Sequence, residues 1–257
     1  MSVLLAAALA GASVFSQIVQ AYVARPRAPF VSYTIRRAQL TADGLPDLEW
    51  SYTDRVWYRA SDASALERRV FRGRPGALSF ERVSFNQAWD PGPPTADVFG
   101  LAGLAAAAPH APGSSDLPYR TIASVVAGGP AYDVTFAQLE SGQWHLRVRP
   151  RHVPGTYILR ELWADAVTFE LRKAIVADKL FIAAGPVYDQ LDTMTFALVN
   201  GREAITHIHA RANFDDQIDG AGSDVDYEFS DVAFPATLPD WYFQPGSYGA
   251  HLGEAPE

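Results

Sequence analysis

The sequence predicts a mainly β (α+β) protein of about eleven antiparallel strands, with an N-terminal helix and a mid-chain helix. Three observations predict this fold class. Apolar and polar residues alternate with a period of two over most of the chain after Phe30. Turns rich in Gly, Pro and Asp separate the alternating runs. Only two stretches, residues 14–23 and 98–108, have a helical pattern instead.

Composition places the chain among ordinary globular proteins and excludes several kinds of site. Hydrophobic residues make up 48% and charged residues 19% of the 257 residues, which is typical of a folded protein. The formal net charge of −8 and the lack of a Lys- or Arg-rich run argue against nucleic acid as a partner. The chain has no cysteine, so disulfides, thiolate metal sites and a lipid-modified cysteine are excluded. We expect no cofactor.

The first twelve residues resemble a secretory signal peptide. Val3–Ala12 is a continuous run of small apolar residues in which Ala10 and Ala12 suit a small-x-small cleavage site. The run is shorter than the roughly 20 residues that a membrane-spanning helix needs. We therefore expect export to the periplasm or cell envelope, no membrane-spanning segment, and a single domain over residues 13–257. The alternative is that residues 1–12 begin the first helix.

The remaining chain is predicted to open with an amphipathic helix, followed by a meander of strands. Apolar residues from 14 to 23 recur at helical spacing, Ser13 can cap the start of the helix, and Pro26 ends it. From Phe30 onward the period changes to two, and Gly and Pro residues mark the turns. In the first third of the chain, strands are predicted at residues 30–36, 48–59, 67–72 and 78–85.

The strand pattern breaks in mid-chain. Asp90–Pro94 is a Pro-rich irregular connector, and residues 98–108 form an Ala- and Leu-rich helix that ends at a proline. Two compatible interpretations of this helix remain open. It packs on the sheet, or it is a lid whose apolar side, with Phe99, Leu101 and Leu104, completes a hydrophobic cavity.

The second half is predicted to be almost entirely strands, with a hairpin at its centre. In the hairpin, alternation places Tyr157, Leu159 and Trp163 on one face. Asp165 and Thr168 suit the turn because their side chains can accept hydrogen bonds from nearby backbone N–H groups. The other strands are predicted at residues 120–127, 132–139, 143–149, 194–199, 204–214 and 224–232.

The hairpin resembles the signature hairpin of LolA-like periplasmic lipoprotein carriers. In those proteins a strand that ends Leu-Trp-x-Asp is followed by a Thr, as at Leu162, Trp163, Asp165 and Thr168. The order of parts extends the resemblance over nearly the whole chain. It implies an incomplete antiparallel barrel whose apolar concave side is covered by helices and binds acyl chains or lipid-modified proteins. The family has a basic residue before a Pro early in the sheet, whereas Arg59 has no such Pro, so the chain resembles a diverged member.

Other candidate sites have simpler interpretations. His207 and His209 share a strand face and could bind a metal, but Arg211 on that face disfavours a cation. The Asp residues between 215 and 226 could bind calcium, although their spacing fits no standard calcium loop. Glu161 and Glu170 could imitate a glycosidase pair, but cross-strand ion pairs with the neighbouring arginines are the simpler use.

The sequence therefore predicts an exported, non-enzymatic binder of a hydrophobic ligand, either an acyl chain, a lipid or a lipid-modified protein. We expect a monomer with no nucleic-acid partner. Two alternatives stay open: a protein-binding or lipid-sensing envelope module, and a metal-dependent hydrolase that uses His207 and His209. The predicted ligand-binding residues are Tyr33, Trp50, Tyr52, Arg59, Phe99, Leu101, Leu104, Tyr157, Leu159 and Trp163.

Overall fold

The chain divides into two compact units, which are described separately. Unit 1 comprises Met1–Pro26, Asp97–Ala197 and Ala210–Phe214, and unit 2 comprises Arg27–Ala96, Leu198–His209 and Asp215–Glu257. A computed structural model describes residues 2–40, 44–47, 51–62, 64–71, 80–84, 93–95, 99, 132–150, 159–181, 187–212 and 224–251. The predicted helix at 98–108, apart from Phe99, and the predicted strand at 120–127 lie outside these residues. The prediction of a single domain stays a prediction.

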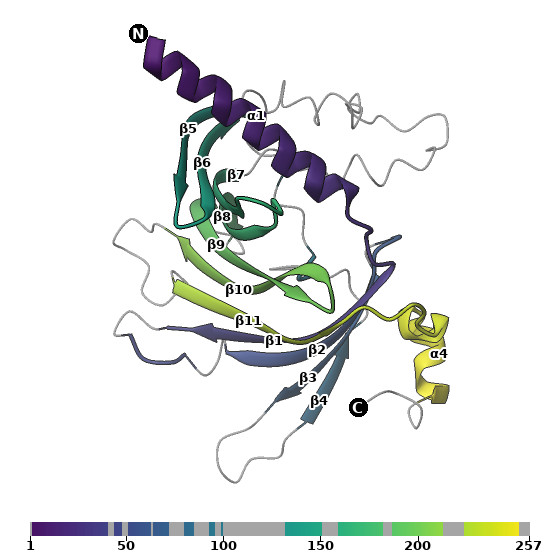
Figure 1. Ribbon diagram of the computed structural model, residues 1–257. Helices are drawn as coiled ribbons and strands as arrows, with labels where there is room; N and C mark the ends of the chain where they lie inside the picture. The colour runs from purple at the N-terminus through teal and green to yellow at the C-terminus, as the bar shows by residue number, and fades with distance from the viewer. Residues whose placement is uncertain are drawn as a thin grey trace, which may run out of the picture. The chain divides into compact units, whose positions relative to one another are not determined.

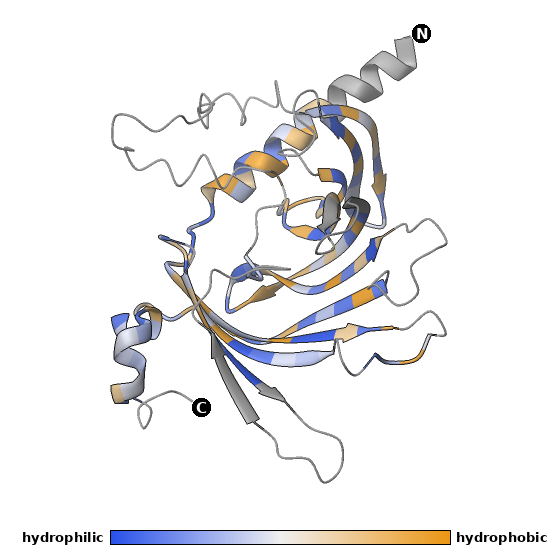
Figure 2. Ribbon diagram, turned by 180° about the vertical axis from the view of Figure 1, so that it is seen from behind, coloured by the Kyte–Doolittle hydropathy of each residue, from blue (hydrophilic) through white to orange (hydrophobic). Residues whose placement is uncertain are grey.

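The described strands form one open antiparallel sheet (Figure 1). The strands are β1 (Phe30–Gln39), β2 (Tyr52–Arg59), β3 (Ser64–Phe71), β4 (Phe80–Ser84), β5 (Tyr132–Glu140), β6 (Gln143–Pro150), β7 (Leu159–Asp165), β8 (Leu171–Phe181), β9 (Val187–Val199), β10 (Arg202–Ala212) and β11 (Asp224–Ala233). Their hydrogen-bonded order is β4-β3-β2-β1-β11-β10-β9-β8-β7-β6-β5. Among the described strands, β4 and β5 at the two ends are not neighbours, so the sheet is unclosed. The predicted fold class is confirmed, and hydrophobic and hydrophilic residues alternate along the strands (Figure 2).

The N-terminal helix α1 (Ser2–Ala24) begins earlier than predicted. Ser13 lies inside the helix, where its Oγ accepts a hydrogen bond from Gln17 Nε2 at 3.4 Å, so its predicted role as the cap is wrong. The Ala- and Leu-rich residues before Ser13 favour a helical conformation, so the helix begins at Ser2 and runs without interruption through Ser13. The end of the helix before Pro26 is confirmed. Among the described residues, no helix is long and apolar enough to cross a membrane.

In unit 1, α1 packs closely against β5. A Cβ atom added at Gly11 would lie only 2.7 Å from Ala137 Cβ, so glycine allows the helix to approach the strand. Further along α1, the Phe15 ring lies 5.8 Å from the Tyr132 ring and 6.1 Å from the Phe99 ring, both in edge-on geometry. The buried apolar residues on the strands of this unit include Leu146, Val148, Leu159, Leu162, Ala164, Leu171, Ala174 and Val176.

In unit 2, a C-terminal helical segment packs against β2 and β3, and Figure 1 shows it beside these strands. It consists of η1 (Asp240–Phe243), α4 (Pro245–Tyr248) and η2 (Gly249–His251). Tyr242 and Tyr248 from this segment form a buried cluster with Trp57 and Leu66 from the strands. We call the face that carries this cluster the outer face of unit 2.

Candidate functional site

The opposite face of the unit 2 sheet, here called the tyrosine face, combines apolar side chains with an arginine and tyrosine cluster. In an antiparallel sheet, residues directly opposite each other on neighbouring strands point to the same side. Ile35 pairs with Phe229 on β11 and with Asp54 on β2, and Arg37 pairs with Tyr227 and Tyr52. The tyrosine face consists of Val31, Tyr33, Ile35, Arg37, Gln39, Tyr52, Asp54, Val56, Tyr58, Val225, Tyr227 and Phe229.

The apolar part of the tyrosine face is buried. Val31, Tyr33 and Ile35 are at most 6% exposed, and so are Val56 and Phe229. The Tyr33 and Phe229 ring centroids lie 5.7 Å apart. Burial raises the pKa of the Tyr33 hydroxyl above its usual value, and the Glu67 carboxylate raises it further, so Tyr33 is neutral at physiological pH.

The polar part of the tyrosine face begins at Arg37. Its guanidinium lies 5.9 Å from the centroid of the Tyr52 ring and 5.8 Å from that of the Tyr227 ring. The Nε donates to the Tyr227 hydroxyl at 3.4 Å, and one terminal nitrogen donates to Gln39 Oε1 at 2.6 Å. Cation–π contacts of this kind orient a guanidinium group as well as stabilise it.

A buried ion pair lies beside Arg37. Arg69 donates two hydrogen bonds of 2.6 Å to the Asp54 carboxylate and also lies 3.5 Å from the Tyr52 ring centroid. Burial alone would lower the pKa of Arg69, but the hydrogen bonds to Asp54 raise it above its usual value. The Asp54 side chain is only 4% exposed, and the two hydrogen bonds from Arg69 compensate the cost of burying its carboxylate.

The structure brings together only part of the predicted ligand-binding set. Tyr33 and Tyr52 lie on the tyrosine face. Phe99 and Leu159 are buried in unit 1, where the Tyr132 hydroxyl donates to the Phe99 carbonyl and accepts from the Leu159 N–H, both at 3.4 Å. The predicted residues outside the described part of the chain are Trp50, Leu101, Leu104 and Tyr157.

The structure places Arg59 apart from Tyr33 and Tyr52, as the alternation along the strand predicts. Arg59 is an odd number of residues from Tyr52 along β2, so its side chain lies on the outer face. There it donates two hydrogen bonds to Asp62 at 3.0 and 2.7 Å and lies 4.3 Å from the Phe243 ring centroid. Arg59 therefore holds the C-terminal segment against the sheet.

The prediction that Trp163 shares a face with Leu159 is also wrong. The β7–β8 register shifts between Leu159 and Glu161, and the extra residue of such a bulge reverses the side on which later residues point. Trp163 therefore lies on the less buried face of unit 1. Its ring stacks on His145 at 4.3 Å, and Lys173 Nζ lies 4.5 Å from its centroid.

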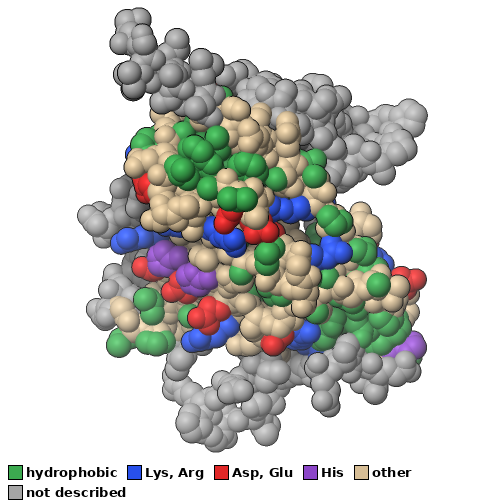
Figure 3. All heavy atoms as spheres, in the orientation of Figure 1, with side chains coloured by type: hydrophobic (Ala, Val, Ile, Leu, Met, Phe, Trp, Pro, Cys, Tyr) green, Lys and Arg blue, Asp and Glu red, His purple; other side chains and the backbone are tan. Residues whose placement is uncertain are grey.

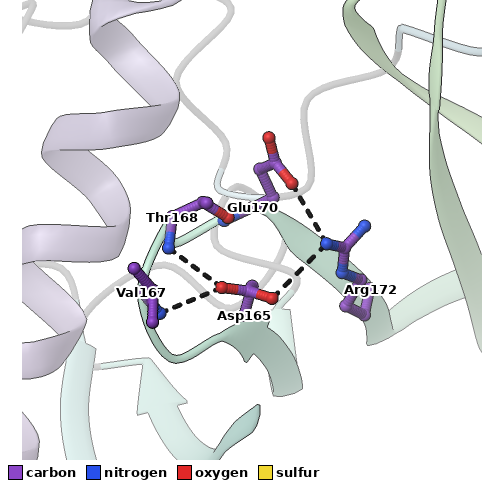
Figure 4. Close-up of polar contacts among 5 residues, drawn as sticks. All are labelled: Asp165, Val167, Thr168, Glu170 and Arg172. Atoms are coloured by element: carbon purple, nitrogen blue, oxygen red, sulfur yellow. Dashed lines mark hydrogen bonds and ion pairs between the residues drawn. The ribbon is translucent and has the colours of Figure 1, made fainter. Parts of the chain in front are cut away.

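The turn of this hairpin forms as predicted (Figure 4). Asp165 Oδ1 accepts hydrogen bonds from the backbone N–H groups of Val167 and Thr168, both at 2.9 Å. These bonds hold the pKa of the Asp165 carboxyl at about 2. Glu170 pairs with Arg172, two residues away on the same side of the hairpin, at 3.1 Å, and Arg172 also lies 3.5 Å from Asp165. Glu161 forms its cross-strand ion pair with Arg147, at 3.3 Å, and not with the predicted arginines.

The two predicted metal-binding histidines contact carboxylates. His207 Nε2 and His209 Nδ1 both lie 2.9 Å from Asp226 Oδ1, and His209 Nε2 lies 3.4 Å from Asp224 Oδ1. Histidine and acidic side chains lie side by side on the surface in Figure 3. Within the described part of the chain, no group of three or more such side chains has the geometry to hold a metal ion.

Sequence reasoning missed Arg37, Gln39, Asp54 and Arg69. The signal for the first two was present, because Arg37 and Gln39 continue the alternation that starts at Val31. For Asp54 and Arg69, the sequence holds no comparable signal, because their contact depends on the register between β2 and β3.

No protein-family model and no curated protein matches the chain. Two solved structures are similar to it. One is a LolA superfamily protein from Nitrosomonas europaea, 12% identical, with a TM-score of 0.41 and an alignment over 90% of this chain and 97% of that one. The other is a DUF1329 family protein from Desulfovibrio piger, 10% identical, with a TM-score of 0.43 and coverage of 94% and 98%. The first belongs to the superfamily that the hairpin resembles. With TM-scores this low, neither similarity bears on what this chain binds.

Proposed function

We propose that the chain is an exported, non-enzymatic protein that binds a hydrophobic ligand on the tyrosine face of unit 2. The ligand is an acyl chain, a lipid or a lipid-modified protein. One observation carries the proposal: the apolar surface from Val31 to Ile35 ends at the Arg37 guanidinium. An amphiphile has the same order of parts, an apolar chain followed by a polar group.

The dimensions of the apolar surface suit a long chain. The seven residues from Val31 to Arg37 extend over about 20 Å at the rise of a β-strand. Each methylene group that leaves water contributes roughly 0.8 kcal/mol, so burial alone can hold an acyl chain without a covalent bond. The mechanism is therefore solvent exclusion on a preformed sheet.

Binding at this face requires an exchange of contacts. Tyr33, Ile35 and Val56 are already buried, so the ligand replaces protein contacts with its own instead of covering open surface. The affinity is then the difference between the two sets of contacts. We propose Tyr33 and Tyr52 as contacts of the ligand, and we propose that export follows removal of residues 1–12.

The test is native mass spectrometry of the protein from its expression host, with lipid extraction and displacement by a hydrophobic dye. We expect co-purified fatty acids or phospholipids that the dye displaces. Phe229→Ala should weaken dye binding because the Phe229 ring lies on the tyrosine face beside Tyr33. The matched control is Phe243→Ala, which removes the same side chain from the outer face.

Two results would overturn the proposal. One is a wild-type protein that carries no lipid and binds neither dye nor long-chain lipid. The other is an equal loss of dye binding in Phe229→Ala and Phe243→Ala when both variants remain folded by circular dichroism. Metal analysis of the same sample tests the alternative that uses His207 and His209.

A further inference from the structure

We infer that Arg37 selects ligands with an anionic head group, a carboxylate or a phosphate, at the end of the tyrosine face. This inference rests on the proposed function, and it names the class of ligand that the same face takes. The inference follows from two observations. The Arg37 guanidinium lies between two tyrosine rings at the end of an apolar surface, and it contacts a neutral amide oxygen.

The two rings fix where the Arg37 guanidinium lies. Tyr52 and Tyr227 are its direct cross-strand neighbours on β2 and β11, and both ring centroids are within 6 Å of its central carbon. An arginine that is held in place before binding loses little side-chain entropy when a ligand arrives. Arg37 is therefore preorganised to receive an oxyanion.

One of the acceptors that Arg37 contacts is a neutral amide oxygen, which a ligand would replace. Gln39 Oε1 accepts a hydrogen bond of 2.6 Å from Arg37, and Gln39 is 2% exposed. A carboxylate or phosphate oxygen in the same position would form a charge-assisted hydrogen bond, which is roughly twice as strong as a neutral one. The preference for an anion thus comes from an exchange of acceptors at Arg37.

Two carboxylates near Arg37 on this face, Asp54 and Glu67, would repel an incoming anion unless their charges are compensated. Asp54 is bound by Arg69 through two hydrogen bonds, so its charge is compensated within the pair. Glu67 is on β3, where it pairs with Val56 of β2. It lies two residues before Arg69, so the two side chains are on the same face of β3. The ion pair with Asp54 holds Arg69 at the Tyr52 ring, and Arg37 is the arginine that contacts a neutral amide oxygen.

The experiment compares three ligands of equal chain length: a saturated fatty acid, an alkyl phosphate and a fatty alcohol. Affinities are measured by dye displacement at low salt with the full chain. The wild type should bind the two anions about tenfold more tightly than the alcohol, since hydrogen bonds to charged groups contribute roughly 1.5–3 kcal/mol. A stronger effect for the acid identifies a carboxylate, and a stronger effect for the phosphate identifies a phosphorylated head group.

Three variants assign the preference to Arg37. Arg37→Gln should abolish the preference for anions and leave alcohol binding within about twofold. Gln39→Glu keeps Arg37 but places a resident carboxylate beside it, so it should weaken anion binding about tenfold and spare the alcohol. Arg36→Gln is the control, because Arg36 pairs with Glu228 on the other face of the same strand.

The failures of the two proposals are distinguishable. If none of the three ligands binds, the proposed function is wrong. If all three bind equally in the wild type, or if folded Arg37→Gln and Gln39→Glu keep the preference, the ligand-binding function stands and the inference about Arg37 is overturned. The inference also fails if Arg36→Gln loses the preference to the same extent as Arg37→Gln.

Discussion

The two faces of the unit 2 sheet are both aromatic, yet they differ in the polar groups that they bury. On the outer face, Trp57 and Leu66 pack against aromatic residues of the C-terminal segment in a hydrophobic cluster. On the tyrosine face, Asp54 and Gln39 are buried, and they contact Arg69 and Arg37. Aromatic content therefore does not identify a binding face in this protein.

The difference indicates separate roles for the two faces. A buried ion pair is a weak source of stability, because the cost of removing both charges from water offsets most of their attraction. A face that served only as a core could carry apolar residues instead of Asp54 and Arg69. We therefore interpret the outer face as a structural core and the tyrosine face as a recognition surface.

The largest expected effect tests the structural role of the outer face. Trp57→Ala should lower the free energy of unfolding by about 4 kcal/mol, because the deletion leaves a cavity against Tyr242. Urea denaturation measures the loss. Tyr242→Phe is the control, since it keeps the ring and should cost much less. A Trp57→Ala protein that unfolds like the wild type would show that the aromatic cluster does not hold the C-terminal segment.

A somewhat smaller effect is expected for the buried ion pair. Asp54→Ala should lower the free energy of unfolding by about 3 kcal/mol, because it leaves the Arg69 charge without its bidentate partner. The double variant Asp54→Ala, Arg69→Met should recover part of this loss, since both charges are then gone.

A double-mutant cycle from urea denaturation supplies the test of this pair. Strict additivity of the two single substitutions would contradict the coupling between Asp54 and Arg69. It would also remove the contrast drawn here between the tyrosine face and the outer face.

The smallest effect concerns the Arg59 contact on the outer face. The hydrogen bonds from Arg59 hold the pKa of Asp62 at about 2, below its ordinary value of 3.8. A carboxyl with a depressed folded-state pKa stabilises the fold above its unfolded pKa and loses this contribution as the pH falls toward 2. Because the Asp62 side chain is 45% exposed, we expect less than about 1 kcal/mol.

The difference in unfolding free energy between the wild type and Asp62→Asn measures this contribution. It should be constant from pH 7 to about pH 5 and shrink between about pH 4 and pH 2. A difference that is independent of pH over this range would show that Asp62 does not act through its charge. The matched control is Asp231→Asn, which makes the same substitution at another exposed carboxylate of unit 2.

The sequence predicted many of the strands well because apolar and polar residues alternate along them. Alternation located β1, β2, β5, β6 and β11 to within a few residues, and the Asp165 turn formed as expected. The same rule failed at Trp163, because the bulge after Leu159 adds one residue that leaves no mark in the alternation. The rule held for Arg59, which it placed on the opposite face of the strand from Tyr52.

The candidate site was predicted only in part. Tyr33 and Tyr52 were predicted because they are aromatic residues in strands whose apolar and polar residues alternate. The same alternation places Arg37 and Gln39 on the face of Tyr33, although neither was predicted. Local sequence could not give their neighbours, because a strand pattern is compatible with many partners. Register and pairing are set by packing over the whole sheet.

The sequence by itself determined which residues share a face within a strand, since the side-chain period of a β-strand is two. Val31, Tyr33, Ile35 and Arg37 are ordered by that period alone. Only the tertiary structure decided which strands lie beside them. Pairing of β1 with β11 brings the Tyr227 hydroxyl to Arg37 across 190 residues of chain. The reason is physical: contacts between distant residues form only when the fold pairs their strands, and a period along one strand carries no record of its partner.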